Sequence, residues 1–129
     1  MLVLGLDIST SCTGWCVLEQ NDTQSHSLVK LGFIPMSNIK DPYRKSQKVR
    51  DELLKLKKDY NIDKVFIEEN LQSFRSGMSS ARTLVTLARF NGVVSYISES
   101  VFKTTPVFIN VNSARKSLGI KIIKKSIRN

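Results

Sequence analysis

The feature that most constrains the fold is a uniformly apolar run, residues 2–6, which stops abruptly at Asp7 and is followed by the polar sequence Ser9-Thr10-Ser11. Such a run is typical of a strand that is covered on both faces. The next apolar run, residues 15–18, follows Thr13-Gly14 closely. A polar stretch this short between two apolar runs predicts an antiparallel hairpin. The chain therefore opens as a β-sheet.

The rest of the chain adds further strands and two helices in alternation. A third apolar run covers residues 28–35, and shorter runs at residues 64–67 and 106–111 predict two later strands. Asp41-Pro42 predicts a helix start, with Asp as N-cap and Pro at the first helical position. The order strand, strand, strand, helix, strand, helix, strand predicts an α/β fold with a five-stranded mixed sheet.

The second predicted helix, residues 79–98, is apolar on most of its circumference. Such a helix needs burial on two sides. We expect its small residues, Ala81, Ala88 and Gly92, to let one face approach the sheet closely. The opposite face then needs a further helix or a second subunit.

Size and composition describe one domain, residues 1–129. The chain has 129 residues, is 41% hydrophobic and carries a formal net charge of +9, which predicts one compact domain with a core of ordinary size. No apolar run approaches the roughly 20 residues of a membrane-spanning helix, and no basic leader precedes the first run. We expect a cytoplasmic protein, in a bacterial, viral or host-cell DNA compartment, without a membrane partner.

Cysteine and histidine offer little chemistry. Cys12 and Cys16 do not have the spacing of a redox or zinc motif, and we expect both to be small core residues. The single histidine, His26, lies in a polar stretch typical of a hairpin tip. A histidine-based metal site or catalytic triad is therefore disfavoured.

The basic residues are concentrated towards the C-terminus. After Glu99 there is no acidic residue, while seven basic residues occupy the last 30 positions. A field of this sign attracts phosphate polymers or acidic lipid surfaces, and phosphate contacts supply most of the affinity of nucleic-acid binding. The alternative is a solvated basic surface that serves solubility.

Carboxylates follow two of the predicted strands. Asp7 ends the first strand, and Glu68 and Glu69 end the fourth. If the two strands are neighbours, these acids would converge at the carboxyl ends of the strands. Ligands gather at this edge of such a sheet. Converging carboxylates favour an oxygen-binding divalent cation, Mg²⁺ or Mn²⁺, which can activate water for phosphodiester hydrolysis. The alternative is an Asx turn at Asp7, with the glutamates paired to arginines.

These residues resemble the RuvC-like Holliday junction resolvases of the RNase H-like superfamily. Residues 4–10 followed by Thr13-Gly14-Trp15 are similar to the opening of that family, and residues 67–69 (Ile-Glu-Glu) resemble its Ile-Glu-Gln. Further similarities are residues 88–92, Pro106-Val107 and the basic segment 115–125. The resemblance implies an RNase H-like fold and a metal-dependent endonuclease that acts on branched DNA, especially four-way junctions, usually as a homodimer.

The resemblance also implies roles for individual residues. Asp7 and Glu68 would be catalytic metal ligands, and Glu69, which stands where the family has Gln, would be an additional or substitute ligand. The family's aromatic wedge follows its second carboxylate, a role that Phe74 would take here. The residues expected to contact DNA are Phe74, Arg75, Lys116, Lys121, Lys124 and Lys125.

The sequence departs from the family in one respect. The family closes its site with two aspartates on a final helix, and this sequence has no acid after Glu99. We therefore expect a chain that is C-terminally truncated relative to the family, without the final helix, and that cleaves DNA weakly or not at all.

Two other functions remain open. Residues 7–10 followed by Gly14 also resemble the phosphate-binding hairpin of actin-like ATPases and sugar kinases, although those proteins need a second lobe. A non-catalytic nucleic-acid-binding module is the other alternative. Stabilisation by nucleotides would favour the ATPase, and stabilisation by junction DNA would favour the resolvase.

Overall fold

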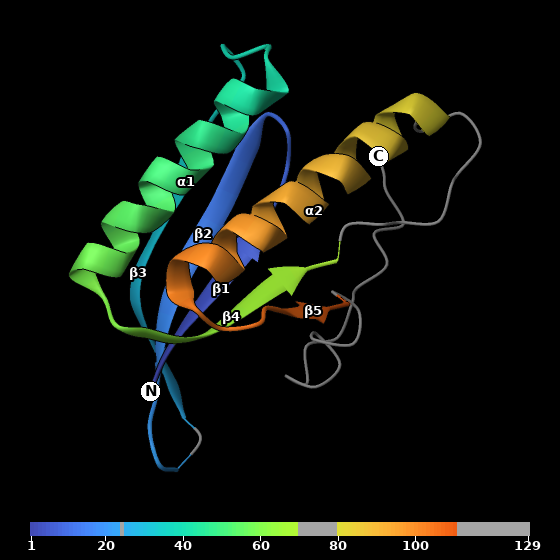
Figure 1. Ribbon diagram of the computed structural model, residues 1–129. Coiled ribbons are helices and arrows are strands. Elements are labelled where there is room, and N and C mark those ends of the chain that lie inside the picture. The colour runs from blue at the N-terminus through green and yellow to red at the C-terminus, as the bar shows by residue number, and fades with distance from the viewer. Residues whose placement is uncertain (24, 70–79, 111–129) are drawn as a thin grey trace, which may run out of the picture.

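A computed structural model describes residues 1–23, 25–69 and 80–110 of the chain. The elements follow the order expected from the sequence, and Figure 1 shows their arrangement. Their bounds are β1 (Leu2–Asp7), β2 (Cys12–Gln20), β3 (His26–Pro35), α1 (Pro42–Asp59), β4 (Ile62–Glu68), α2 (Ala81–Phe102) and β5 (Val107–Ile109).

The strands form one five-stranded mixed sheet in the order β3-β2-β1-β4-β5. β1, β2 and β3 are an antiparallel meander, which confirms the predicted hairpin. β4 is parallel to β1 on one side and to β5 on the other. The carboxyl ends of β1 and β4 therefore meet at the same edge of the sheet.

Both described helices cover one face of the sheet (Figure 1). Alternate strand residues point to this face, because side chains along a strand point to opposite sides in turn. On β1 these residues are Leu4 and Leu6, and on β4 they are Val65 and Ile67, all of them buried. They pack with the buried side of the helices into one hydrophobic core.

Helix α1 begins where the sequence predicts. The side chain of Asp41 accepts a hydrogen bond from the backbone N–H of Tyr43 at 3.0 Å, and Pro42 occupies the first helical position. Val49, Leu53 and Leu56 form the buried stripe. A capped start and an apolar stripe at helical spacing are the two signals that sequence can supply directly.

Helix α2 differs from the prediction in its bounds and in the face that it buries. It starts two residues later than expected, after the N-cap Ser80, and continues to Phe102. The small residues Ala81, Ala88 and Gly92 are exposed, so they do not bring the helix close to the sheet. Instead, the packing follows positions at spacings of three and four, whatever the side-chain size: the buried residues are Phe90, Asn91, Val94, Ser98 and Val101.

The expectation that both cysteines belong to the core is wrong. Cys12 is exposed and Cys16 is half-buried. Both lie on the side of β2 opposite to Thr13 and Val17, the two residues that are fully buried on the helix-covered face. His26 is exposed at the first position of β3. Within the described residues, neither helix is long and apolar enough to cross a membrane.

Candidate active site

Asp7 is fixed by the buried residues on either side of it. Leu6 is 3% exposed and Ile8 is fully buried, and both belong to the core. Since neighbouring strand residues point to opposite faces, Asp7 points away from the helices. The residue is exposed, so its carboxylate is accessible to solvent and to a ligand.

The loop after Asp7 is held by short-range hydrogen bonds and by helix α1. The Ser9 hydroxyl accepts a hydrogen bond from the Ser11 backbone N–H at 3.4 Å, and the hydroxyl of the fully buried Thr13 donates to the Ser9 carbonyl at 3.3 Å. Lys45 on α1 donates from Nζ to the Thr10 carbonyl at 2.6 Å. These contacts tie the end of β1 to a rigid helix.

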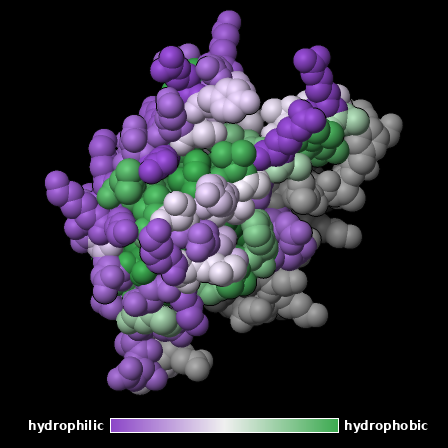
Figure 2. All heavy atoms as spheres, viewed as in Figure 1, coloured by the Kyte–Doolittle hydropathy of each residue, from purple (hydrophilic) through white to green (hydrophobic). Residues whose placement is uncertain are grey.

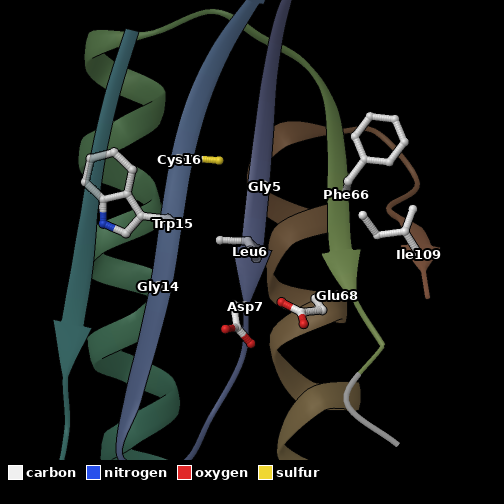
Figure 3. A pocket seen from close by; sticks show the side chains of 9 residues that line it. All are labelled: Gly5, Leu6, Asp7, Gly14, Trp15, Cys16, Phe66, Glu68 and Ile109. Carbon is white, nitrogen blue, oxygen red and sulfur yellow. The ribbon is translucent and has the colours of Figure 1, made fainter. Parts of the chain in front are cut away.

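Glu68 lies beside Asp7 at the end of β4. Leu6 pairs with Ile67 in the parallel register, which places the following residues of the two strands next to each other. Figure 3 shows both carboxylates on the sheet face that lies away from the helices, turned towards each other. They line a common hollow of about 240 Å³. The structure thus brings together the two residues that the sequence singled out.

Glu69 occupies a different position. It is exposed, and its backbone N–H donates to the Ile109 carbonyl at 2.8 Å, continuing the link between β4 and β5. It does not line the hollow. Among the described residues no group of three or more His, Cys, Asp or Glu side chains is placed to hold a metal ion.

All six residues expected to contact DNA lie outside the described part of the chain. They are Phe74, Arg75, Lys116, Lys121, Lys124 and Lys125.

The hollow contains residues that sequence reasoning did not identify. Besides the two carboxylates, its lining includes Gly5, Cys16, Phe66 and Ile109. The signal was available in part: Gly5 and Phe66 stand two positions before Asp7 and Glu68, which places them on the same face of the sheet. The hollow beside the carboxylates depends on how the neighbouring strands pack, so the sequence does not indicate it.

A second, larger groove runs between α1 and α2 on the other face. It encloses about 900 Å³ and reaches Thr10, three residues after Asp7. Its cationic lining residues are Lys40, Lys45 and Arg89, and its exposed aromatic residues are Tyr43 and Tyr96. Figure 2 shows hydrophobic residues along the band between the two helices, bordered by hydrophilic ones.

The paired carboxylates define what the site can do chemically. Carboxylate oxygens are the ligands that Mg²⁺ prefers, and Mg²⁺ is commonly held by only one or two of them together with water and substrate phosphates. Among the described residues that line the hollow there is no Lys, Arg or His. The site is therefore suited to a hard cation that bridges to a phosphate.

No family model matches the sequence. Over 113 residues the chain is 31% identical to the crossover junction endodeoxyribonuclease RuvC of Anaplasma marginale (strain Florida), which covers 80% of this chain and 67% of that protein. Over 71 residues it is 35% identical to the protein of the same name from Ehrlichia ruminantium (strain Gardel), covering 54% of this chain and 44% of that protein. The chain thus spans less than half the length of the second relative.

Structural comparison agrees with the sequence comparison. Thermus thermophilus RuvC, solved in complex with a Holliday junction substrate, superposes with a TM-score of 0.73 over 100% of this chain and 83% of that chain. Sequence identity in this superposition is 14%, so the likeness speaks for the fold alone. The predicted RNase H-like fold is confirmed.

Proposed function

This chain belongs to the RuvC family of crossover junction endodeoxyribonucleases, and from that premise we propose that it is a structure-selective endonuclease that hydrolyses phosphodiester bonds in branched DNA, above all in four-way junctions. One observation carries the proposal: Asp7 and Glu68 meet at the carboxyl ends of adjacent strands, in a solvent-accessible hollow. The net charge of +9 supports a polyanionic substrate. We take residues 1–129 as a single nuclease domain.

The cofactor in this proposal is Mg²⁺, with Mn²⁺ able to substitute. The donor set fits, because two carboxylates that face each other repel unless a cation or a proton lies between them. Cys16, the softest donor in the lining, lies opposite Gly5 and thus away from the carboxylate end of the strands, so the site favours a hard ion over a thiophilic one. Glu69 is proposed as a further or substitute ligand.

In this mechanism the residues of the chain bind and orient the cation and the DNA. Asp7 and Glu68 would hold the cation at the sheet edge, and the buried neighbours of Asp7 would keep its carboxylate in place. When bound, the cation supplies activation of water and stabilisation of the leaving oxygen. The remaining task, holding the DNA backbone, is assigned to the positions named from the family resemblance: Phe74, Arg75, Lys116, Lys121, Lys124 and Lys125.

We also propose that the chain acts as a homodimer through the exposed side of α2. Val85, Val93 and Tyr96 lie at helical spacing and are 47%, 43% and 72% exposed. A Cβ built on Gly92, in the middle of this stripe, has no atom within 4 Å. An exposed apolar stripe around a glycine allows a second helix to approach closely. A four-way junction offers two symmetric cutting points, which suits a two-fold dimer.

The experiment that tests the function compares substrates and metals. Gel-shift and cleavage assays would use a four-way junction, linear duplex and an RNA–DNA hybrid, each with Mg²⁺, with Mn²⁺ or with a chelator. We expect tightest binding to the junction and cleavage only with a metal. Junction binding without any cleavage would favour the non-catalytic module. Thermal stabilisation by ATP but not by junction DNA would favour the actin-like ATPase, which family membership already disfavours.

A further inference from the structure

Three consecutive carbonyl groups in the loop between β1 and β2, those of residues 9–11, each accept a hydrogen bond from a different element. The first accepts from the Thr13 hydroxyl on β2 at 3.3 Å, and the third accepts from the Met36 backbone N–H, directly after β3, at 2.8 Å. The middle carbonyl, of Thr10, accepts from Nζ of Lys45 on α1 at 2.6 Å. This contact is the shortest of the three and has a charged donor, and charge-assisted hydrogen bonds are the stronger ones. Lys45 therefore links the centre of this loop firmly to a helix.

Lys45 departs from the amphipathic pattern of α1. The buried stripe of the helix consists of Val49, Leu53 and Leu56. Lys45 stands four residues before Val49, which places it on the same face of the helix, and it is half-buried. Because helical side chains lean towards the N-terminal end of their helix, Lys45 extends past the stripe towards the loop after β1, beside which α1 begins (Figure 1). An apolar residue would continue the stripe, so the Thr10 carbonyl explains the lysine better than packing does.

The loop held by Lys45 starts at one of the two carboxylates. Asp7 is the last residue of β1, and the parallel register with β4 ends one residue before Asp7 and Glu68. The direction of the Asp7 side chain therefore depends also on the residues that follow it. Ile8 is fully buried and fixes the first of them. The next contact with a helix is the Thr10 carbonyl, so a shift of this carbonyl can be transmitted to Asp7 over only three residues.

We propose that Lys45 is a positioning residue for the paired carboxylates: by holding the Thr10 carbonyl, it keeps Asp7 in the position relative to Glu68 that a divalent cation requires. This inference rests on the proposed nuclease function. Lys45 acts through the loop and contacts neither the cation nor the DNA. Mg²⁺ requires nearly ideal octahedral geometry, with ligands at roughly 2.0–2.1 Å. A small displacement of one carboxylate therefore lowers the affinity for Mg²⁺, and loss of a group that orients metal ligands commonly costs about 10- to 100-fold in affinity or activity.

Three variants test this assignment. Lys45→Met keeps the unbranched side chain but removes the donor and the charge, whereas Lys45→Arg keeps a cationic donor of similar reach. Lys40 is exposed and lines the same groove between α1 and α2 as Lys45. Lys40→Met therefore makes the same chemical change on the same surface and leaves the hydrogen bond to Thr10 in place. Cooperative thermal unfolding of all three variants checks that they fold, which the buried stripe of α1 should ensure.

Metal binding is measured first on the protein without DNA. A titration with Mg²⁺, followed by NMR at the backbone amides of Asp7 and Gly14, which pair across β1 and β2, gives the Kd. We expect Lys45→Met to raise this Kd about tenfold, and Lys45→Arg and Lys40→Met to stay within about twofold of wild type. Amide hydrogen exchange of residues 9–11 should become faster in Lys45→Met alone. Equal Kd values for the two Lys45 variants, or for Lys45→Met and Lys40→Met, would overturn the inference.

Cleavage of junction DNA supplies the second measurement. In Lys45→Met the Mg²⁺ concentration for half-maximal cleavage should rise about tenfold, while the rate at saturating Mg²⁺ stays within about twofold of wild type. Junction binding in the presence of chelator should not change. A variant that is merely less folded would lose rate at every Mg²⁺ concentration, so a loss that saturating Mg²⁺ does not restore would overturn the positioning role. The proposed function fails in a different way: a wild-type protein that binds Mg²⁺ but cleaves no junction would refute the nuclease, whatever Lys45→Met does to the Kd.

Discussion

Asp7 and Glu68 stand 61 positions apart in the sequence and lie side by side on parallel strands, with their carboxylates turned towards each other (Figure 3). The register of β1 and β4 creates this pairing, because Leu6 is matched with Ile67 directly before it. In the proposed function a cation between these two anionic groups offsets their mutual repulsion.

Removing one of these charges should separate DNA binding from cleavage. Asp7→Asn keeps the size and hydrogen-bonding capacity of the side chain but removes a metal-binding oxygen anion. We expect metal-dependent junction cleavage to be abolished and junction binding in the presence of chelator to be unchanged. A variant that still cuts at the wild-type rate would remove Asp7 from the mechanism.

Glu68 and Glu69 allow a comparison between adjacent carboxylates. Glu68 lines the hollow and Glu69 does not, so Glu68→Gln should raise the Mg²⁺ concentration needed for half-maximal cleavage more than Glu69→Gln does. If Glu69 acts on the site indirectly, Glu69→Gln should raise this Mg²⁺ concentration by about 10-fold. A Mg²⁺ titration of both variants measures this. An equal rise in the required Mg²⁺ concentration for the two variants would mean that Glu69 is as important a ligand as Glu68.

A charge on the exposed side of α2 should dissociate the proposed dimer. Val93→Glu places a carboxylate at the centre of the stripe formed by Val85, Val93 and Tyr96, where burial against a second subunit would desolvate it. We expect a dimer for wild type and a monomer for the variant in light scattering, with a cooperative thermal unfolding transition in both. A Lys57→Glu variant, at an exposed position near the end of α1, should remain dimeric. Identical masses for wild type and Val93→Glu would exclude this surface.

The basic C-terminal segment should set the salt dependence of DNA binding. Replacing Lys121, Lys124 and Lys125 by Gln removes three positive charges, and each lost phosphate contact reduces the magnitude of the negative slope of log K against log salt by roughly 0.9. We expect a slope that is less steep by about 2 to 3. The control carries the same charge change at exposed positions of α1: Lys55, Lys57 and Lys58. A slope that is unchanged in the first variant would assign its lysines to a solvated surface.

Local signals predicted the elements and the pair of carboxylates. The apolar run that ends at Asp7 and the cap formed by Asp41 and Pro42 both act within a few residues, so they can be found without knowing the fold. The order of elements then made a parallel pairing of the first and fourth strands plausible, and the carboxyl ends of such strands share one edge. Asp7 and Glu68 were therefore accessible to sequence reasoning.

Predictions that depend on which face is covered were not accessible in the same way. Cys16 and Val17 are neighbours of similar character, but only Val17 lies on the face that the helices cover, and it is fully buried. On α2, small residues at Ala88 and Gly92 suggested a close approach to the sheet, whereas the ridge through Phe90 and Val94 makes the contact. Side-chain size alone does not specify orientation. The hollow and its lining depend on the same tertiary information.

The indole of Trp15 should make Gly32 sensitive to the smallest substitution. Trp15 on β2 pairs with Gly32 on β3, and a Cβ on Gly32 would lie 2.5 Å from the indole Cζ2 and 2.7 Å from Cε2. Because Trp15 also packs against the core, it cannot move aside freely. Gly32→Ala should therefore lower the free energy of unfolding by about 1 to 3 kcal/mol, the usual cost of overpacking.

Urea denaturation measures this loss, with an unchanged m-value showing that the same surface unfolds. Gly92→Ala is the matched control, because a Cβ there meets no atom within 4 Å and the residue lies inside α2. Alanine is the better helix former, so at a protein concentration at which both proteins are monomeric this variant should be more stable than wild type by up to about 1 kcal/mol. The same Gly→Ala substitution should thus lower the free energy of unfolding at Gly32 and raise it at Gly92. A neutral Gly32→Ala variant would mean that the indole has an alternative position of equal energy.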